Sequence, residues 1–390
     1  MSAERKAAPS SSRVIFVVFI LLLLDLLGFT LILPLLPSIL DHYAHTEDAV
    51  YQTLQSSVDV FREALGIPME KKFNSVLFGG LMGSVFSLLQ FLASPITGAL
   101  SDRYGRRPLL LLTTAAIGVA FSVGFTAGPL MGAYLSSGSQ STRHLFFQTP
   151  ALLSLAFSVA DLLFIWLMLP ETLSMNAKAS HSGFGDFRDL LSPLALFNFS
   201  AVTRSKAPPS EQKMRRLKLL GHVYFCYLFL FSGLEFTLSF LTHQRFHFTS
   251  MQQGKMFFFI GVTMASIQGG YARRIKPGHH VKAVRMAIAA LIPAFILIGI
   301  SWNVTMLYVG LALYSFAAAV VVPCLSTLVS DHGSASQKGT VMGILRSLGA
   351  LARALGPVTS SSVYWLAGAQ TCFLVTSASF LVPLILLSTA

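Results

Sequence analysis

The chain has 390 residues, of which 54% are hydrophobic and 11% are charged, whereas an ordinary soluble protein is about 45–50% apolar and about 25% charged. Its mean hydropathy is +0.67 and its formal net charge is +12. This composition excludes a soluble globular enzyme, a disordered protein and a small disulfide scaffold, and it predicts an all-α polytopic membrane protein.

Apolar residues gather in blocks that are long enough to span a membrane, since a bilayer core requires about 20 apolar residues per helix. The blocks divide the chain into a cytoplasmic N-terminus (1–13), an N-terminal helical bundle (14–169), a cytoplasmic linker (170–217) and a C-terminal six-helix bundle (218–390). Ten segments qualify as spans: 14–40, 77–100, 109–135, 146–169, 218–242, 254–272, 283–301, 304–329, 339–366 and 369–388.

Basic residues indicate the orientation, because Lys and Arg concentrate in cytoplasmic loops. With the N-terminus in the cytoplasm, 20 of the 28 Lys and Arg residues fall on the cytoplasmic side and 6 fall outside. We therefore expect both termini in the cytoplasm, and we assign the positive charge to topology rather than to nucleic-acid binding. Two loop segments, 53–67 and 184–197, carry apolar residues at helical spacing. They are expected to lie on the bilayer surface or, alternatively, to dock a partner.

Asp25 lies in the middle of the first span, at the start of Asp-Leu-Leu-Gly-Phe-Thr-Leu-Ile-Leu-Pro. An ionisable side chain at the bilayer centre costs at least about 2.5–3.5 kcal/mol, and it faces the protein interior when it occurs. Two interpretations stay open. Asp25 exchanges a proton during a transport cycle, or it hydrogen bonds to a neighbouring helix.

The second span ends in Gly-Ala-Leu-Ser-Asp-Arg-Tyr-Gly-Arg-Arg-Pro, residues 98–108. A carboxylate is disfavoured at a helix C-terminus, so the aspartate requires a positive partner, which a neighbouring arginine or the start of a facing helix can supply. The motif resembles the G-x-x-x-D-R-x-G-R-R signature of the major facilitator superfamily. That resemblance implies a fold of two helical bundles and a conformational latch formed by Gly98, Asp102, Arg103, Gly105 and Arg106.

The third block contains a second motif, G-x-x-x-G-P-x-x-G. Glycines four residues apart form a smooth face for close helix packing, and the proline bends the helix. The motif resembles the fifth helix of antiporter members of the superfamily, which implies antiport rather than uniport. Its residues are Gly124, Gly128, Pro129 and Gly132.

Ten residues separate Arg107 from Gly118, whereas the family places two further helices between these motifs. We therefore interpret block 109–135 as the start of the third helix joined to the fifth, which predicts about 10 helices (4 + 6) instead of 12. Loss of an even number of helices preserves the orientation of every later span. It also puts transport by this chain in question, because the missing helices would line or brace the N-terminal cavity.

Three ionisable residues stand out in the spans of the C-terminal bundle. Arg346 and Arg353 are seven residues apart and share a helix face, and arginine recognises a carboxylate through paired hydrogen bonds, so we predict that they bind an anionic substrate. Alternatively, Arg346 extends to the headgroups and Arg353 pairs with Glu235 or Asp25. Glu235 couples protons, contacts a cationic substrate or pairs with an arginine. Two other ionisable residues are expected at the membrane interface and between helices, respectively: His222 and Asp161.

Segments 74–81, 231–245 and 338–353 resemble the tetracycline-transporter-like subgroup of the superfamily. The resemblance implies an organic-anion or drug antiporter that works by alternating access, with proton coupling through Asp25 and Glu235. Two other functions stay open. The chain is a truncated, non-transporting isoform or regulatory membrane protein, or it is a proton symporter of small metabolites.

Metal-binding, nucleotide-binding and nucleophile motifs are absent from the sequence, so we expect neither an enzyme nor a metal or other cofactor. The three cysteines lie inside apolar blocks, and no disulfide partner is expected. The expected partners are membrane lipid and an amphipathic organic anion or drug. We expect a monomer in the plasma membrane, with an organelle membrane as the alternative.

Overall fold

The computed structural model of the chain describes residues 192–203, 209–332 and 338–388 as continuous ranges. Every regular element within these ranges is a helix, in agreement with the predicted all-α class. Isolated helical residues are also described earlier in the chain: Ile20, Leu23, Ser56, Asp59, Val60, Glu63, Val76, Leu77, Gly79, Gly80, Leu81, Ser84, Val85, Ser87, Leu88, Phe91, Leu153, Ala156 and Ala160.

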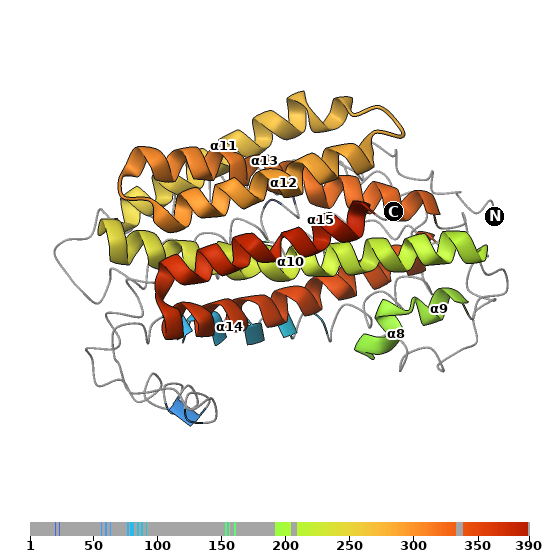
Figure 1. The fold of residues 1–390 in the computed structure, drawn as a ribbon, viewed down its shortest axis with the longest axis horizontal. Helices are drawn as coiled ribbons and strands as arrows, with labels where there is room; N and C mark the ends of the chain where they lie inside the picture. Colours follow the sequence, from blue (N-terminus) through green and yellow to red (C-terminus); the bar gives the residue numbers. More distant parts are fainter. Residues whose placement is uncertain are drawn as a thin grey trace, which may run out of the picture.

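Long helices that lie side by side form the C-terminal bundle (Figure 1). Their bounds are α10 Glu211–Phe246, α11 Ser250–Gly270, α12 His280–Ile300, α13 Val304–His332, α14 Lys338–Ser379 and α15 Leu381–Ser388. Four described segments are long and apolar enough to cross a membrane: Glu211–Phe246, His280–Ile300, Val304–His332 and Val341–Ser388. The last segment changes direction at Gly368, after which the chain runs back along the bundle to the C-terminus. These helices occupy the predicted spans and extend beyond most of their predicted ends.

Local signals set several helix ends. α11 begins with a capping box, in which the Thr249 hydroxyl accepts a hydrogen bond from the Gln252 amide (3.3 Å) and the Gln252 side chain accepts one from the Thr249 amide (2.8 Å). These bonds satisfy amides that the first helical turn leaves free. α10 ends at His247, which has a left-handed backbone. The break in α14 has a φ of +80° at Gly368, a conformation that glycine adopts easily because it has no Cβ.

α10 and α14 pack closely through small residues. A Cβ added at Gly349 would lie 3.0 Å from side-chain atoms of Tyr224 and Leu228, and one added at Gly356 would overlap the Ser232 hydroxyl. Residue numbers rise together along the two helices, so they run parallel. Small residues let membrane helices approach each other closely, and this packing replaces the hydrophobic driving force that lipid cannot supply.

Side chains also tie the helix ends together. At the end of α10, Arg245 donates hydrogen bonds to the carbonyl oxygens of Gly299 (2.6 Å) and Ser301 (3.3 Å), at the C-terminal end of α12. This cation lies where the helix dipole is negative. In the last span, the Ser377 hydroxyl donates to the Ile292 carbonyl of α12 (2.8 Å).

The described part of the linker packs against the bundle. It contains α8 (Pro193–Phe197) and α9 (Ser200–Thr203). Between them, Phe199 is fully buried, and a Cβ added at Gly221 would lie 2.7 Å from its ring. The end of the expected surface helix 184–197 therefore continues into a segment anchored on α10. Most of that segment lies outside the described residues, as does most of the expected helix 53–67.

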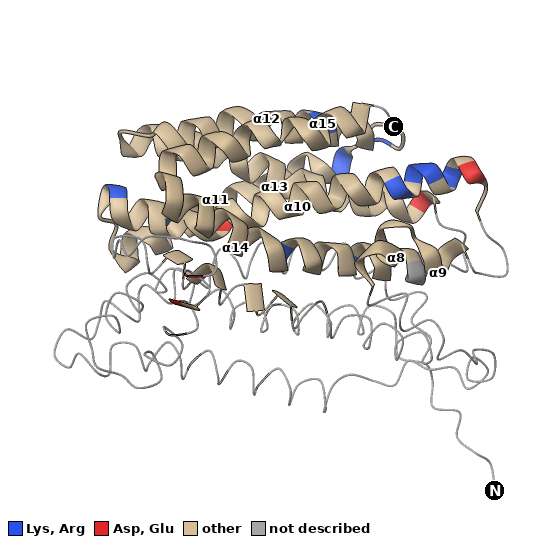
Figure 2. Cartoon of the chain, turned by 60° about the horizontal axis from the view of Figure 1, so that its bottom comes forward, with Lys and Arg blue, Asp and Glu red and all other residues tan. Residues whose placement is uncertain are grey.

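Charged residues concentrate at one end of the bundle (Figure 2). Nine described Lys and Arg residues lie where α10 and α12 begin and α11 ends: Lys213, Arg215, Arg216, Lys218, Arg273, Arg274, Lys276, Lys282 and Arg285. The opposite end carries Arg245 and Lys255. This asymmetry is the one that the positive-inside rule associates with a cytoplasmic face, so we expect the basic end of the bundle to face the cytoplasm.

Candidate functional site

Most of the site residues predicted in the N-terminal half lie outside the described residues, so their roles stay predictions. They comprise the acid of the first span, the latch motif, the antiporter-type motif and the acid of the fourth span: Asp25, Gly98, Asp102, Arg103, Gly105, Arg106, Gly124, Gly128, Pro129, Gly132 and Asp161. The three remaining residues, Glu235, Arg346 and Arg353, lie on the adjoining helices α10 and α14.

Glu235 is half-buried in the outer half of α10, and its surroundings are aromatic. Its carboxylate lies within electrostatic range of the hydroxyls of Tyr227 and Tyr314. The Tyr227 hydroxyl is buried and has no hydrogen-bond partner in the described part of the chain. No ion pair joins Glu235 to another described residue. The acid is therefore held among neutral polar groups rather than by a direct cationic partner of the described bundle.

Arg353 is half-buried on α14, on the helix that packs along α10. Its guanidinium lies within electrostatic range of Glu235 and Tyr224, yet it forms no ion pair with a described residue. Pro357 lies four residues later and has no amide hydrogen, so the Arg353 carbonyl lacks its usual helical donor. Arg353 thus brings a cation within electrostatic range of the acid of α10.

Arg346 lies two turns earlier on α14 and is exposed. Tyr224 is within electrostatic range of both arginines, and this tyrosine packs against Gly349, which lies between them in the sequence. The predicted shared face is consistent with this arrangement. The two side chains differ in solvent exposure, because Arg353 is half-buried whereas Arg346 is exposed.

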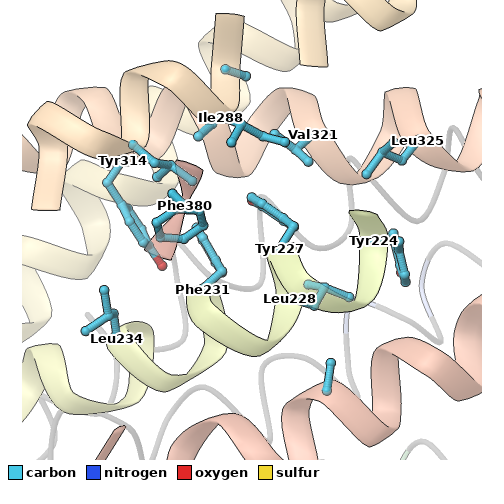
Figure 3. Packing of buried hydrophobic residues seen from close by; sticks show 14 of the residues in the cluster. Tyr224, Tyr227, Leu228, Phe231, Leu234, Ile288, Tyr314, Val321, Leu325 and Phe380 are labelled. Carbon is cyan, nitrogen blue, oxygen red and sulfur yellow. The ribbon is translucent and has the colours of Figure 1, made fainter. Parts of the chain in front are cut away.

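Figure 3 shows an aromatic cluster that contains Tyr227 and Tyr314, the two tyrosines within electrostatic range of Glu235. The rings of Phe231 and Tyr314 stack with centroids 4.8 Å apart and planes 9° apart. Tyr227 stacks on Phe231 at 5.3 Å, and Phe380 lies 6.3 Å from Tyr227. The motifs and intramembrane charges of the sequence do not point to these aromatic residues. Tyr224, Tyr227, Phe231 and Glu235 follow one another at intervals of three or four residues, so helical spacing would have placed the aromatic residues near the acid.

These groups can bind an amphipathic anion. A guanidinium offers paired donors to a carboxylate, and aromatic rings with polar tips offer an apolar surface together with hydrogen-bonding groups. A carboxylate within range of the guanidinium gives the site a group that can take up and release a proton. The site thus combines a cation for an anionic head, rings for an apolar body and a titratable acid.

His222 lies apart from this site, near the basic end of α10. It is exposed, its Nδ1 lies 2.7 Å from the Lys218 carbonyl oxygen, and its ring centroid is 5.0 Å from that of Phe197 in α8. The histidine therefore contributes to the contact between the linker and the bundle rather than to the arginine site.

The described residues of 76–91 pack against α10 and α14 beyond Arg353. The Val358 amide donates a hydrogen bond to the Ser84 hydroxyl (3.1 Å). A Cβ added at Gly80 would overlap the Ser361 hydroxyl. The two parts of the chain thus touch one to two helical turns past Arg353, on the side where the predicted orientation places the outer face of the membrane.

Comparisons with known proteins give consistent results. A family model described as Major Facilitator Superfamily matches residues 18–121 and 112–357. Major facilitator superfamily domain-containing protein 10 of Mus musculus is 51% identical over 438 aligned positions, which cover 98% of this chain and 94% of the mouse protein. Tetracycline resistance protein, class D, of Salmonella ordonez is 23% identical over 406 positions, with 89% of each chain covered.

A solved structure extends the likeness to three dimensions. The crystal structure of the human organic anion transporter MFSD10 (TETRAN) superposes with a TM-score of 0.82 at 51% sequence identity. The match covers 97% of this chain and 100% of the human one.

Proposed function

The chain belongs to the major facilitator superfamily, and from this premise we propose that it is a secondary antiporter of amphipathic organic anions or drugs that works by alternating access. Members of this family are membrane transporters rather than enzymes, and the chain is a multi-pass membrane protein. In the proposed cycle, Arg353 and Arg346 bind the anionic group of the substrate, while Asp25 and Glu235 carry the coupled proton.

The observation that carries this proposal is the position of Arg353. A guanidinium at membrane depth is costly and needs a compensating interaction. Arg353 is half-buried, lies within electrostatic range of Glu235 and has no ion pair among the described residues. A bound anion would supply that interaction, and the adjoining aromatic cluster would accept the apolar part of the same molecule.

The names of the relatives support the proposed substrate class and the proposed direction of transport. The human protein with the similar structure is named an organic anion transporter, which agrees with an arginine site for anions. A bacterial relative is named a tetracycline resistance protein, which supports export of drugs. For this chain, the substrate, the export direction and the plasma membrane as its location are all part of the proposal.

A second candidate function is favoured by the length of the alignments. The alignment with the mouse relative has 438 positions, whereas this chain has 390 residues, so at least 48 positions of that alignment face a gap. The family model also matches in two overlapping parts, 18–121 and 112–357. Both findings fit the absence of two helices between Arg107 and Gly118. The alternative is therefore a non-transporting isoform that binds the longer protein or another membrane partner.

The test is transport of a labelled amphipathic carboxylate drug in proteoliposomes under an imposed proton gradient. We expect Arg353→Ala to raise KM roughly 10- to 100-fold, because hydrogen bonds to a charged group contribute about 1.5–3 kcal/mol. Arg353→Lys keeps the charge but loses the planar fork, so it should restore only part of the affinity.

The matched control is Arg215→Ala, which removes an exposed arginine that pairs with Glu211 at 2.7 Å on the same bundle. This variant should transport normally. Intact transport by Arg353→Ala would refute the anion site. Accumulation in the direction of the proton gradient would replace antiport with symport, and a complete lack of transport by the unmodified chain would favour the non-transporting isoform.

A further inference from the structure

A cluster of cations surrounds the connection between α11 and α12. Its five members lie on the 3-10 turn η5 (Ala272–Arg274), on the following loop and on the first turns of α12, and all five are exposed: Arg273, Arg274, Lys276, Lys282 and Arg285. We name this set the loop cation cluster. The sequence contains no Asp or Glu between Glu235 and Asp331. Asp331, at the end of α13, forms no ion pair with the cluster.

The backbone that carries these cations is anchored to the bundle. The ring of Tyr271 lies 5.8 Å from that of Phe316 in α13, and Ile275 packs against the hydrophobic core. A turn closes with a hydrogen bond from the His279 amide to the Lys276 carbonyl (3.0 Å), and Gly278 has a φ of +88°. The backbone that carries the cations is therefore fixed on the bundle. Arg285 also donates a hydrogen bond to the Leu387 carbonyl of α15 (3.4 Å), whereas the other four cations have no ion pair with a described residue.

There is open space beside the cluster. A Cβ added at Gly269, Gly270 or Gly278 would meet nothing within 4 Å. α12 begins without a side-chain cap and has no acidic residue in its first turn, so the helix dipole adds to the positive potential of the cations. An anionic group can thus approach both the side chains and the backbone of this connection.

An apolar stripe leads from the cluster along the outer surface of the bundle. On α11, Phe258, Val262 and Ala265 are exposed at helical spacing and continue to Gly269. On α12, Met286 is 47% exposed and follows Arg285 directly. The surface therefore offers cations at the membrane edge and apolar side chains on the membrane side of them, which is the polarity of a phospholipid.

We propose that the loop cation cluster binds the headgroup of an anionic phospholipid in the cytoplasmic leaflet, while the exposed stripe of α11 contacts its acyl chains. Basic clusters next to a membrane helix attract anionic lipids, and basic pockets between helices hold their headgroups. Cations that served only to set the topology would need no adjoining apolar stripe. This binding surface is separate from the arginine site of α14, and it does not depend on whether the chain transports.

The test is a titration of the purified full chain, in a neutral detergent, with short-chain phosphatidylglycerol while thermal unfolding is followed. We expect the unfolding temperature to rise, because a ligand that binds the folded state stabilises it. Short-chain phosphatidylcholine, which has the same tails but no net charge, should have no such effect. Inorganic phosphate, which has the charge but no tails, should have none either.

The combined variant Arg273→Gln, Arg274→Gln and Lys276→Gln should lose at least tenfold in apparent affinity for phosphatidylglycerol, since each cation near a membrane contributes roughly fivefold. Arg274→Gln alone, a milder change, should lose roughly fivefold. The matched control combines Lys213→Gln, Arg216→Gln and Lys218→Gln, which removes the same charge from the same end of the bundle and should keep the affinity.

Three outcomes would overturn the proposal. Equal losses in the loop and control variants would show diffuse attraction rather than a site. Stabilisation by phosphate as strong as by phosphatidylglycerol would identify a soluble anion as the ligand. An unfolding temperature unchanged by phosphatidylglycerol would show that the surface binds no lipid headgroup.

Discussion

Two arginines of the bundle, Arg245 and Arg353, differ in the partners of their guanidinium groups. Arg245 directs its guanidinium to the carbonyls of Gly299 and Ser301, where hydrogen bonds and the negative end of α12 offset its burial. Arg353 has no comparable partner in the described part of the chain, although it lies within range of Glu235. The fold explains the first arginine, whereas the partner that we propose for the second is a bound anion.

Glu235→Gln tests proton coupling at the residue scale. The amide keeps the shape of the side chain but cannot gain or lose a proton, so we expect substrate exchange without a gradient to continue. The response of transport to an imposed proton gradient should disappear. Both quantities are measured in the same proteoliposomes, with and without a pH difference across the membrane.

The control for this change is Glu211→Gln, which alters an exposed acid at the start of α10. That variant should keep its gradient response. A Glu235→Gln protein that still follows the gradient would leave Asp25 as the remaining candidate for the proton carrier.

At the scale of the elements, the contact between α10 and α14 determines the geometry of the site. Gly356 faces Ser232 and the backbone of Gly233, and a Cβ on Gly233 would in turn overlap the Ser360 hydroxyl. These small residues bring the two axes close together, and the approach leaves Arg353 within electrostatic range of Glu235. A larger residue would separate the helices and move the two charges apart.

Gly356→Ala should therefore destabilise the bundle by about 1–3 kcal/mol, the usual cost of overpacking. Gly343→Ala is the matched control on the same helix, because a Cβ there meets nothing within 4 Å. Since alanine is the better helix former, this control should be neutral or more stable by about 0.5–1 kcal/mol. Thermal unfolding in detergent measures both, and equal stabilities would contradict the packing described for α10 and α14.

On the scale of the whole molecule, the sequence predicts four spans in the N-terminal half and six in the C-terminal half. The C-terminal bundle has helices at its predicted spans, four of its described segments are long and apolar enough to cross a membrane, and the described residues of the second span touch it through Ser84 and Gly80. The alignment with the mouse relative leaves at least 48 positions facing a gap, and we infer that this gap lies in the N-terminal half. Alternating access requires both halves to enclose one substrate site, so the gap bears directly on activity.

Restoring the missing segment tests this point. Inserting the corresponding residues of the mouse relative between Arg107 and Gly118 should raise flux of the carboxylate drug well above that of the unmodified chain, because two helices that line or brace the cavity return. Flux through both proteins is measured side by side in proteoliposomes of equal protein content. The inserted chain with Arg353→Ala is the control and should lose the gain, whereas equal flux with and without the insert would contradict the inferred loss of helices.

The sequence alone determined that the chain is a helical membrane protein, where the spans of the C-terminal bundle lie and which family it resembles. These properties depend on the length of apolar runs, the distribution of Lys and Arg and short motifs, all of which are local along the chain. It also indicated Glu235, Arg346 and Arg353, because a charge within an apolar run is conspicuous in one dimension.

Only the tertiary structure decided which side chains meet. It placed Tyr227 and Tyr314 within electrostatic range of Glu235, anchored Phe199 of the linker on α10 and gave Arg245 its carbonyl partners. An aromatic residue in a span has the same hydropathy whether it faces lipid, the protein core or a binding site. The amino-acid sequence therefore does not reveal which side chains contact it in the fold. The rotation of each helix and the choice of its partner follow from the packing of all the helices together.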